Sequence, residues 1–328
     1  MKKRIGKINT DAIVFSNTDK TAEELLELFL QEKQAFNLSP ETISLYRYHC
    51  MQFIQSLGIA AKEPGYKVLT IESYKEFVLS LKKRNIKDVS VASIARSVRT
   101  WLYWLMENNC INAFHVVIPK YQKTVPETYT DEELAILLEK PKRNCTEVEY
   151  ETWVFINIAI ATGLRLSSIL SLKVRDIHFS DNTIAVNKTK NRAALSLVAN
   201  DELLAILKNY IRIFDLQPDD YLMCTGEKGK LARRTMENFV ERYNMKRGVQ
   251  KKKIIHAFRH TFARNHYLQN HDMYRLKNLM GHTLISTTEH YLGSLGLDTS
   301  KKIENNPQAQ FIKKPEPKRS RRKKVSHP

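Results

Sequence analysis

Helix caps followed by apolar residues at helical spacing recur from Thr21 to about Asn108 and limit the folds that this chain can adopt. Thr21-Ala-Glu-Glu24 matches a capping box, and Ser39-Pro40 combines an N-cap with a proline at the first helical position. Thr70 caps a third predicted helix, and a fourth is expected from about Val89 to Asn108. Four amphipathic helices in so short a stretch can bury their apolar stripes only against one another, so we predict a helical bundle.

The pattern stops after residue 118 and then resumes. Pro119–Thr128 contains two prolines and no periodicity, which is typical of an interdomain linker. Thr130-Asp-Glu-Glu133 is another capping box and begins the second domain. Trp153–Ala161 is the most apolar run of the chain, so it predicts a buried helix that ends at Gly163 and is too short to cross a bilayer.

Beyond Leu172 the period changes from helical to alternating. Ile177–Phe179 and Thr183–Val186 flank a turn at Asp181-Asn182, and a third strand is expected over Ala194–Val198 after a basic turn. Helices are expected again over 200–214 and 233–246. The predicted fold class is therefore mainly α (α+β), a helical bundle followed by a mostly helical domain with a small antiparallel three-stranded sheet.

The charge balance indicates the kind of partner. Lys and Arg number 53 against 35 Asp and Glu, a net charge of +18, which favours a polyanion such as nucleic acid over a merely solvated basic surface. The four cysteines form no CxxC pair, so neither a zinc site nor a disulfide framework is predicted. With no secretory segment recognised at the N-terminus, we expect a cytoplasmic protein with no membrane partner.

Five residues of the second domain suit phosphodiester chemistry. Arg165 follows the apolar helix, and Arg259 lies in the apolar segment HAFRHTFA together with His256. His282 and Tyr291 follow within a short distance. Arginines bind non-bridging phosphate oxygens as permanently charged forks, histidines transfer protons near neutral pH, and a tyrosine hydroxyl can attack phosphorus to form a covalent intermediate.

Three segments, in this order, resemble the tyrosine recombinase (phage integrase) family of the Xer-like or transposon integrase type. They are TGLRLS from Thr162, HAFRH from His256 and MGHTLISTTEHY from Met280. The resemblance extends over roughly Thr21 to Leu295 and is densest after Tyr129. The expected organisation is an N-terminal arm (1–20), a helical core-binding domain that binds DNA (21–118), a linker (119–128), a catalytic domain (129–298) and a basic disordered tail (299–328).

The resemblance also implies a role for each residue. Arg165 and Arg259 would clamp the scissile phosphate, and Tyr291 would be the nucleophile. His256 would be the proton-transfer histidine, and His282 would donate to the phosphate. His260 matches no catalytic position of the family, so a helix contact or a supporting role is expected for it.

Two further positions match the family less closely. Lys188, in the basic turn, corresponds to the hairpin lysine that protonates the departing 5′ oxygen, but Asn187 precedes it where the family often has glycine, and Lys190 is an alternative. Ser168 stands where the family usually has an acidic residue that supports the geometry of the active site.

The implied activity is site-specific DNA recombination or integration, as in mobile elements, through a 3′-phosphotyrosyl intermediate. Neither a cofactor nor a metal is expected, and the partners would be two double-stranded DNA sites held by a homotetramer at the nucleoid. A DNA-binding accessory factor without catalysis and a type IB topoisomerase are the alternatives. A zinc hydrolase is disfavoured because Ala257 occupies the place of the glutamate that an HExxH helix requires.

Overall fold

The computed structural model describes residues 19–122, 125–186, 195–224, 226, 228–251, 254–282 and 284–297. The chain falls into two compact units, unit 1 (Met1–Lys123) and unit 2 (Thr124–Pro328). In the described part of the chain, no helix has both the length and the apolar character needed to span a bilayer.

Unit 1 is a helical bundle in which the predicted caps set the helix starts. Its elements are α1 (Ala22–Ala35), α2 (Pro40–Ser56), the 3-10 turn η1 (Gly58–Lys62), α3 (Gly65–Val68), α4 (Ile71–Lys83) and α5 (Asp88–Glu107). Thr21 and Thr70 form capping boxes, in which each side chain accepts a hydrogen bond from the backbone of the first helical turn. The Ser39 side chain accepts from the Thr42 backbone N–H ahead of α2. Helix α3 is only one turn long and was not predicted from the sequence.

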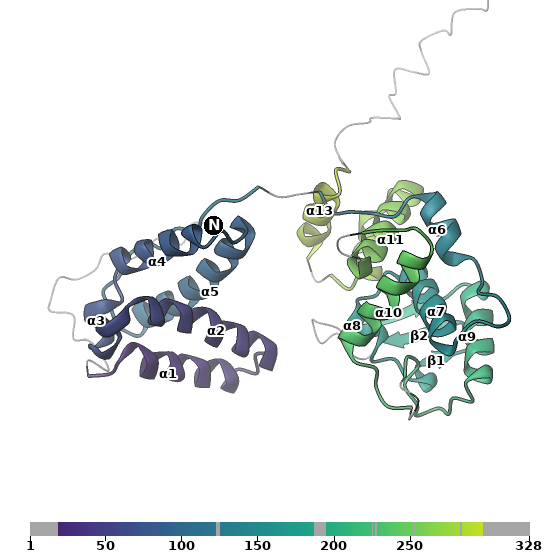
Figure 1. The fold of residues 1–328 in the computed structure, drawn as a ribbon, viewed down its shortest axis with the longest axis horizontal. Coiled ribbons are helices and arrows are strands. Elements are labelled where there is room, and N and C mark those ends of the chain that lie inside the picture. The colour runs from purple at the N-terminus through teal and green to yellow at the C-terminus, as the bar shows by residue number, and fades with distance from the viewer. Residues whose placement is uncertain are drawn as a thin grey trace, which may run out of the picture. The chain divides into compact units, whose positions relative to one another are not determined.

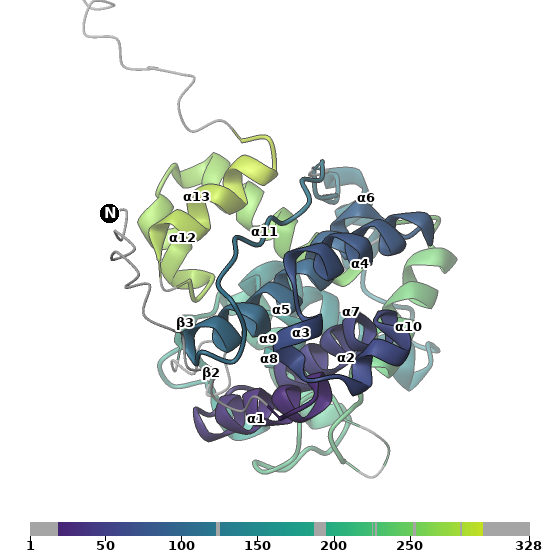
Figure 2. The same cartoon turned by 90° about the vertical axis from the view of Figure 1, so that its left-hand side faces the viewer.

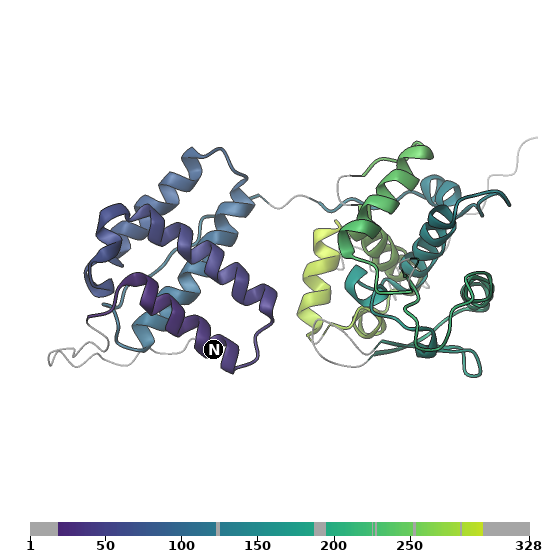
Figure 3. The ribbon, with the colours of Figure 1, turned by 60° about the horizontal axis from the view of Figure 1, so that its bottom comes forward.

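The apolar stripes of unit 1 meet in one core. Phe29, Phe53, Phe77 and Trp101 come from four different helices and are all fully buried. The Phe53 ring packs against those of Phe77 and Trp101, with centroids 5.1 and 6.5 Å apart. Figure 3 shows these purple-to-blue helices packed side by side. The predicted bundle is therefore confirmed.

Unit 2 is built around one helix. Its elements are α6 (Asp131–Leu138), α7 (Glu147–Thr162), α8 (Leu166–Ile169), η2 (Val174–Asp176), β1 (Ile177–His178), β2 (Thr183–Val186), β3 (Leu195–Val198), α9 (Asp201–Ile213), α10 (Arg233–Lys246), α11 (Ile254–Asn270), α12 (Met273–Leu279) and α13 (Ile285–Ser294). The apolar helix α7 packs against α6, α8, α9, α10 and α11 (Figure 1). These neighbours fix the position of α7, and therefore of its C-terminal end at Gly163.

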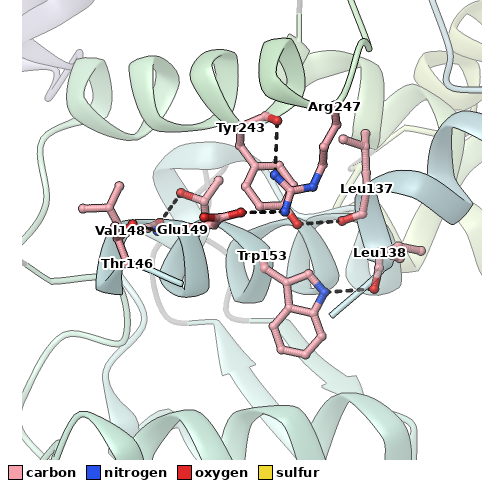
Figure 4. Close-up of polar contacts among 9 residues, drawn as sticks. Leu137, Leu138, Thr146, Val148, Glu149, Trp153, Tyr243 and Arg247 are labelled. Carbon is pink, nitrogen blue, oxygen red and sulfur yellow. Dashed lines mark hydrogen bonds and ion pairs between the residues drawn. The ribbon is translucent and has the colours of Figure 1, made fainter. Parts of the chain in front are cut away.

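Polar contacts tie the N-terminal half of α7 to its neighbours (Figure 4). Glu149 of α7 pairs with Arg247, just beyond α10, at 2.7 Å, and the Arg247 guanidinium lies 3.6 Å from the centre of the Tyr243 ring. The Tyr243 hydroxyl in turn donates to the Leu137 carbonyl of α6 at 3.1 Å. These contacts join α6, α7 and α10 through side chains that are largely withdrawn from water, where such pairs are screened less than at the surface.

The predicted three-stranded sheet is present, with antiparallel order β1-β2-β3. Ile184 lies opposite both Ile177 and Leu197, and all three are buried, so one face of the sheet belongs to the core of unit 2. The mainly α (α+β) fold class is confirmed. The basic turn between β2 and β3, which contains Lys188 and Lys190, lies outside the described residues.

Candidate active site

A left-handed turn at the end of α7 presents the first predicted arginine. Gly163 has φ +61°, and a Cβ built there would lie 2.2 Å from the Phe262 ring of α11, so only glycine fits both the backbone and the space. Arg165 follows as the N-cap residue of α8 and is half-buried. Burial lowers the pKa of Arg165, whereas Tyr291 acts in the opposite direction.

The second predicted arginine is buried at the centre of the site. Arg259, on α11, is 7% exposed. Its guanidinium donates to the Gly163 carbonyl at 2.6 Å, to the Met280 carbonyl at 2.8 Å and to His282 Nε2 at 3.3 Å. Burial, followed by the nearby Arg165 charge, lowers the pKa of Arg259 to about 10, so it stays cationic at neutral pH.

His282 is held on both sides, and its partners set its tautomer. A guanidinium only donates, so Nε2 must accept the hydrogen bond from Arg259. The neutral ring then carries its proton on Nδ1, which lies 2.9 Å from the Thr288 hydroxyl oxygen of α13. Burial, Arg259 and Arg165, in that order, lower the pKa of His282 to about 4, so the ring is neutral at pH 7.

Tyr291 enters the same cluster from α13. It lies three residues after Thr288, and residues at this spacing share one side of a helix. Its hydroxyl is 2.6 Å from Nδ1 of His260, and the two rings stack with centroids 5.1 Å apart. The His282 ring meets Tyr291 edge-on at 5.9 Å. Figure 2 shows α11, α12 and α13 side by side around this corner of unit 2.

The charges of the cluster favour an anionic ligand. Among the described residues, no carboxylate acts on the guanidinium of Arg165 or Arg259. Burying cations without counter-charges is costly, and an anion bound between them offsets that cost. Burial raises the pKa of Tyr291 to about 12, against the opposing effect of the two arginines, so the phenol is protonated near pH 7.

The predicted site residues are brought together to different degrees. Arg165, Arg259, His282 and Tyr291 form one cluster. His256 is exposed on α11, with its ring 6.4 Å from that of His260. Ser168 is 3% exposed within α8. Among the residues that the structure describes, no three His, Cys, Asp or Glu side chains are grouped so as to hold a metal ion.

Three contributors to the site were not among the predicted catalytic residues. Thr288 orients His282, the Gly163 carbonyl holds Arg259, and His260 contacts the Tyr291 hydroxyl. Thr288 lies three residues before Tyr291, but no helix was predicted there, so the sequence did not place the two side chains on one side of α13. The family pattern had separated His260 from His256 and predicted only a helix contact or a supporting role for His260; its contact with the Tyr291 hydroxyl depends on how α13 packs against α11.

Comparison with known proteins settles the family. Residues 127–295 match the model described as "Phage integrase family", which is more than half of the chain. This chain belongs to the phage integrase family. The predicted tyrosine-type site-specific recombinase is thereby confirmed at the level of the family.

Relatives of this family member match along most of its length. A tyrosine recombinase XerA from Pyrococcus furiosus is 26% identical over 273 residues, covering 82% of this chain and 88% of the relative. A tyrosine recombinase from Pseudothermotoga lettingae is 29% identical over 264 residues, with 78% and 88% covered. Among solved structures, a lambda integrase dimer bound to a COC′ core site has a TM-score of 0.68 at 14% identity, covering 86% of this chain and 97% of that one, which shows a shared fold.

Proposed function

We propose that this phage integrase family member cleaves and rejoins DNA through a covalent 3′-phosphotyrosyl intermediate formed by Tyr291. The observation that carries the proposal is the Tyr291 hydroxyl in one buried cluster with two arginines that have no carboxylate partner among the described residues. A phosphodiester between Arg165 and Arg259 would supply the missing negative charge. Their fixed donors would stabilise the charge that develops on its oxygens during transfer.

The reaction proceeds in two reversible steps. The Tyr291 oxygen gives up its proton to a neighbouring base and bonds to phosphorus while the bond to the 5′ oxygen breaks, and Lys188 supplies the proton that the leaving oxygen needs. His282 donates to the phosphate once a proton on Nε2 replaces the hydrogen bond that this atom accepts from Arg259. The negative charge of bound phosphate favours this protonation by offsetting the charges of Arg259 and Arg165. A 5′-hydroxyl of the partner duplex then attacks the phosphotyrosine and releases Tyr291. The covalent link conserves the bond energy, so no nucleotide is consumed and no metal takes part.

We further propose the assembly in which this chemistry serves recombination. The bundle over residues 21–118 binds one side of the duplex and the domain over 129–298 the other, with 119–128 as the linker between them. Four copies hold two DNA sites at the nucleoid, in the cytoplasm. The solved lambda integrase that shares the fold is a dimer on its core site, which supports binding of adjacent copies to DNA.

A trapped adduct tests the chemistry. A duplex site selected by the protein from a random pool is nicked near the cleavage point, so that the short 5′-hydroxyl strand diffuses away and religation fails. The expected result is a protein–DNA adduct that survives denaturing electrophoresis and forms in EDTA without nucleotide. Tyr291→Phe should bind the site and give no adduct.

The matched control is Tyr274→Phe, because Tyr274 lies on the neighbouring helix α12 and is 72% exposed. It should form the adduct at the rate of the unmodified protein. A protein that binds its selected site and forms no adduct is an accessory factor, and the proposal then fails. If the adduct forms, exchange between two sites distinguishes recombination from topoisomerase-like relaxation of a plasmid.

A further inference from the structure

The attacking oxygen has a hydrogen-bond partner that the proposed reaction does not yet use. The Tyr291 hydroxyl lies 2.6 Å from His260 Nδ1, and across the described residues it has no other hydrogen-bond partner. The two rings stack at an interplanar angle of 25°, which fixes their mutual orientation. Tyr291 belongs to α13 and His260 to α11, so the contact joins two helices whose apolar residues form a small core of their own.

We propose that His260 takes the proton of Tyr291 as its oxygen attacks phosphorus and returns it during religation, an inference that rests on the function proposed above. The neutral ring carries its own proton on Nε2 and accepts the hydroxyl proton at Nδ1. The new oxygen–phosphorus bond replaces the bond to the 5′ oxygen, which takes its proton from Lys188. His260 leaves the step as imidazolium, and religation reverses each transfer.

A base is needed because Tyr291 stays protonated at neutral pH. Burial outweighs the two arginines and raises the pKa of its hydroxyl to about 12. Arg165 and Arg259 cannot accept the proton, because guanidinium groups only donate. Some other group close to the hydroxyl must therefore receive it.

The other histidine beside Tyr291 is already committed. His282 accepts from Arg259 through Nε2, and its Nδ1 bonds to Thr288. His256 lies one helical turn before His260, is exposed, and makes no hydrogen bond to the Tyr291 hydroxyl in the described part of the chain. His260 is thus the imidazole in direct contact with the reacting atom.

The first test compares the rate of adduct formation on the nicked substrate. His260→Ala should slow the formation of the adduct by a factor on the order of 10²–10⁴, the usual contribution of general acid–base catalysis. His260→Asn places a hydrogen-bonding atom near the position of Nδ1 without a base, so it should be similarly slow even if the alanine variant folds poorly. His290→Ala is the matched control, because His290 precedes Tyr291 and is exposed. It should react at the rate of the unmodified protein.

A second measurement separates proton transfer from positioning. Fluorinated tyrosine placed at position 291 ionises more readily, so it depends less on a base. The defect of His260→Ala should therefore shrink at least tenfold with fluorotyrosine, whereas loss of positioning alone would leave the ratio of rates unchanged. Addition of 5′-hydroxyl strand to preformed adduct should also show slow religation in both variants, since the same proton must return.

The outcomes separate the two proposals. If the unmodified protein forms no adduct, the proposed function fails. If it forms the adduct and both His260 variants match it in rate, the function stands and His260 is not the base. A His260→Ala defect that fluorotyrosine leaves unchanged also overturns proton transfer. A slow variant restored by fluorotyrosine supports it.

Discussion

Arg259 holds the carbonyl oxygen of Gly163 at 2.6 Å, so the second arginine of the site fixes the turn that carries the first. Arg165 follows two residues later, and the Phe262 ring closes over the glycine from the same helix as Arg259. The turn at Gly163 and helix α11 therefore position both guanidinium groups together. A change that moves the turn should displace both.

Replacement of Gly163 by alanine tests this close contact between the turn and α11. The left-handed backbone costs about 1–2 kcal/mol for a residue with a Cβ, and the clash with Phe262 should add about 1–3 kcal/mol. Gly248→Ala is the control, because Gly248 has φ +72° and nothing within 4 Å of a built Cβ. Denaturant unfolding should show a larger loss of free energy of unfolding for Gly163→Ala. The additional Phe262→Leu substitution should reduce the difference, and equal losses for the two single variants would contradict the close approach.

Thr288 should matter for cleavage through His282. Thr288→Val keeps the shape but leaves Nδ1 of the buried ring without its partner, which should cost about 1–3 kcal/mol in stability. It should also slow adduct formation, because the ring is no longer oriented. Thr288→Ser keeps the hydroxyl and should retain the rate, and Thr287→Val, at an exposed neighbour, should change neither quantity. A normal cleavage rate for Thr288→Val would show that His282 needs no such support.

A buried carboxyl group in unit 2 should make stability depend on pH. Burial raises the pKa of Glu151 to about 7, and its carboxyl oxygen accepts from the Cys224 backbone N–H at 3.0 Å. The folded state keeps the proton while the unfolded chain loses it from about pH 4.5, so stability attributable to this group falls as pH rises from about 4.5 to 7. Glu151→Gln keeps an acceptor and removes the titration.

Unfolding curves at pH 5 and pH 8 measure the effect. The unmodified protein should lose a few kcal/mol more than Glu151→Gln between these values. Other groups titrate in both proteins, so only the difference between the two is diagnostic. Parallel pH dependences would mean that Glu151 is ionised in the folded protein.

The leaving-group acid can be assigned by a sulfur substitution in the DNA. Lys188→Ala should slow cleavage by a factor on the order of 10²–10⁴ with little loss of binding. A substrate with sulfur at the 5′-bridging position has a leaving group that needs no proton, so it should restore the rate. Lys190→Ala is the paired variant, and rescue of that variant alone would move the assignment two residues along the chain.

The basic C-terminal segment should contribute to DNA binding without sequence preference. Lys313–Lys324 contains eight Lys and Arg residues. Deletion of 313–328 should leave the free energy of unfolding unchanged and flatten the dependence of log K on log salt by roughly 0.9 for each phosphate that the segment neutralises. A full-length variant with these Lys and Arg replaced by Gln should behave the same way. An unchanged salt slope in both would show that the segment does not bind DNA.

Local signals explain why so much of the fold could be predicted. A capping residue and its helix are neighbours in the chain, so Thr21, Ser39 and Thr70 marked helix starts that the structure confirms. The end of α7 at Gly163 could also be predicted from the sequence, because a left-handed C-cap depends mainly on one residue, usually glycine. The one-turn helix α3 was missed because four residues are too few to show a period.

Tertiary structure alone decided which side chains of the site touch. His256 and His260 share one face of α11, and the choice of His260 as the partner of Tyr291 depends on how α13 packs against that helix, 31 residues further along the chain. The carbonyl of Gly163 reaches Arg259 across 96 residues for the same reason. Residue type and local spacing determined the helices, the sheet and the set of groups able to handle a phosphodiester. Their hydrogen bonds and pKa shifts arise from burial and distance, which exist only after the helices have packed.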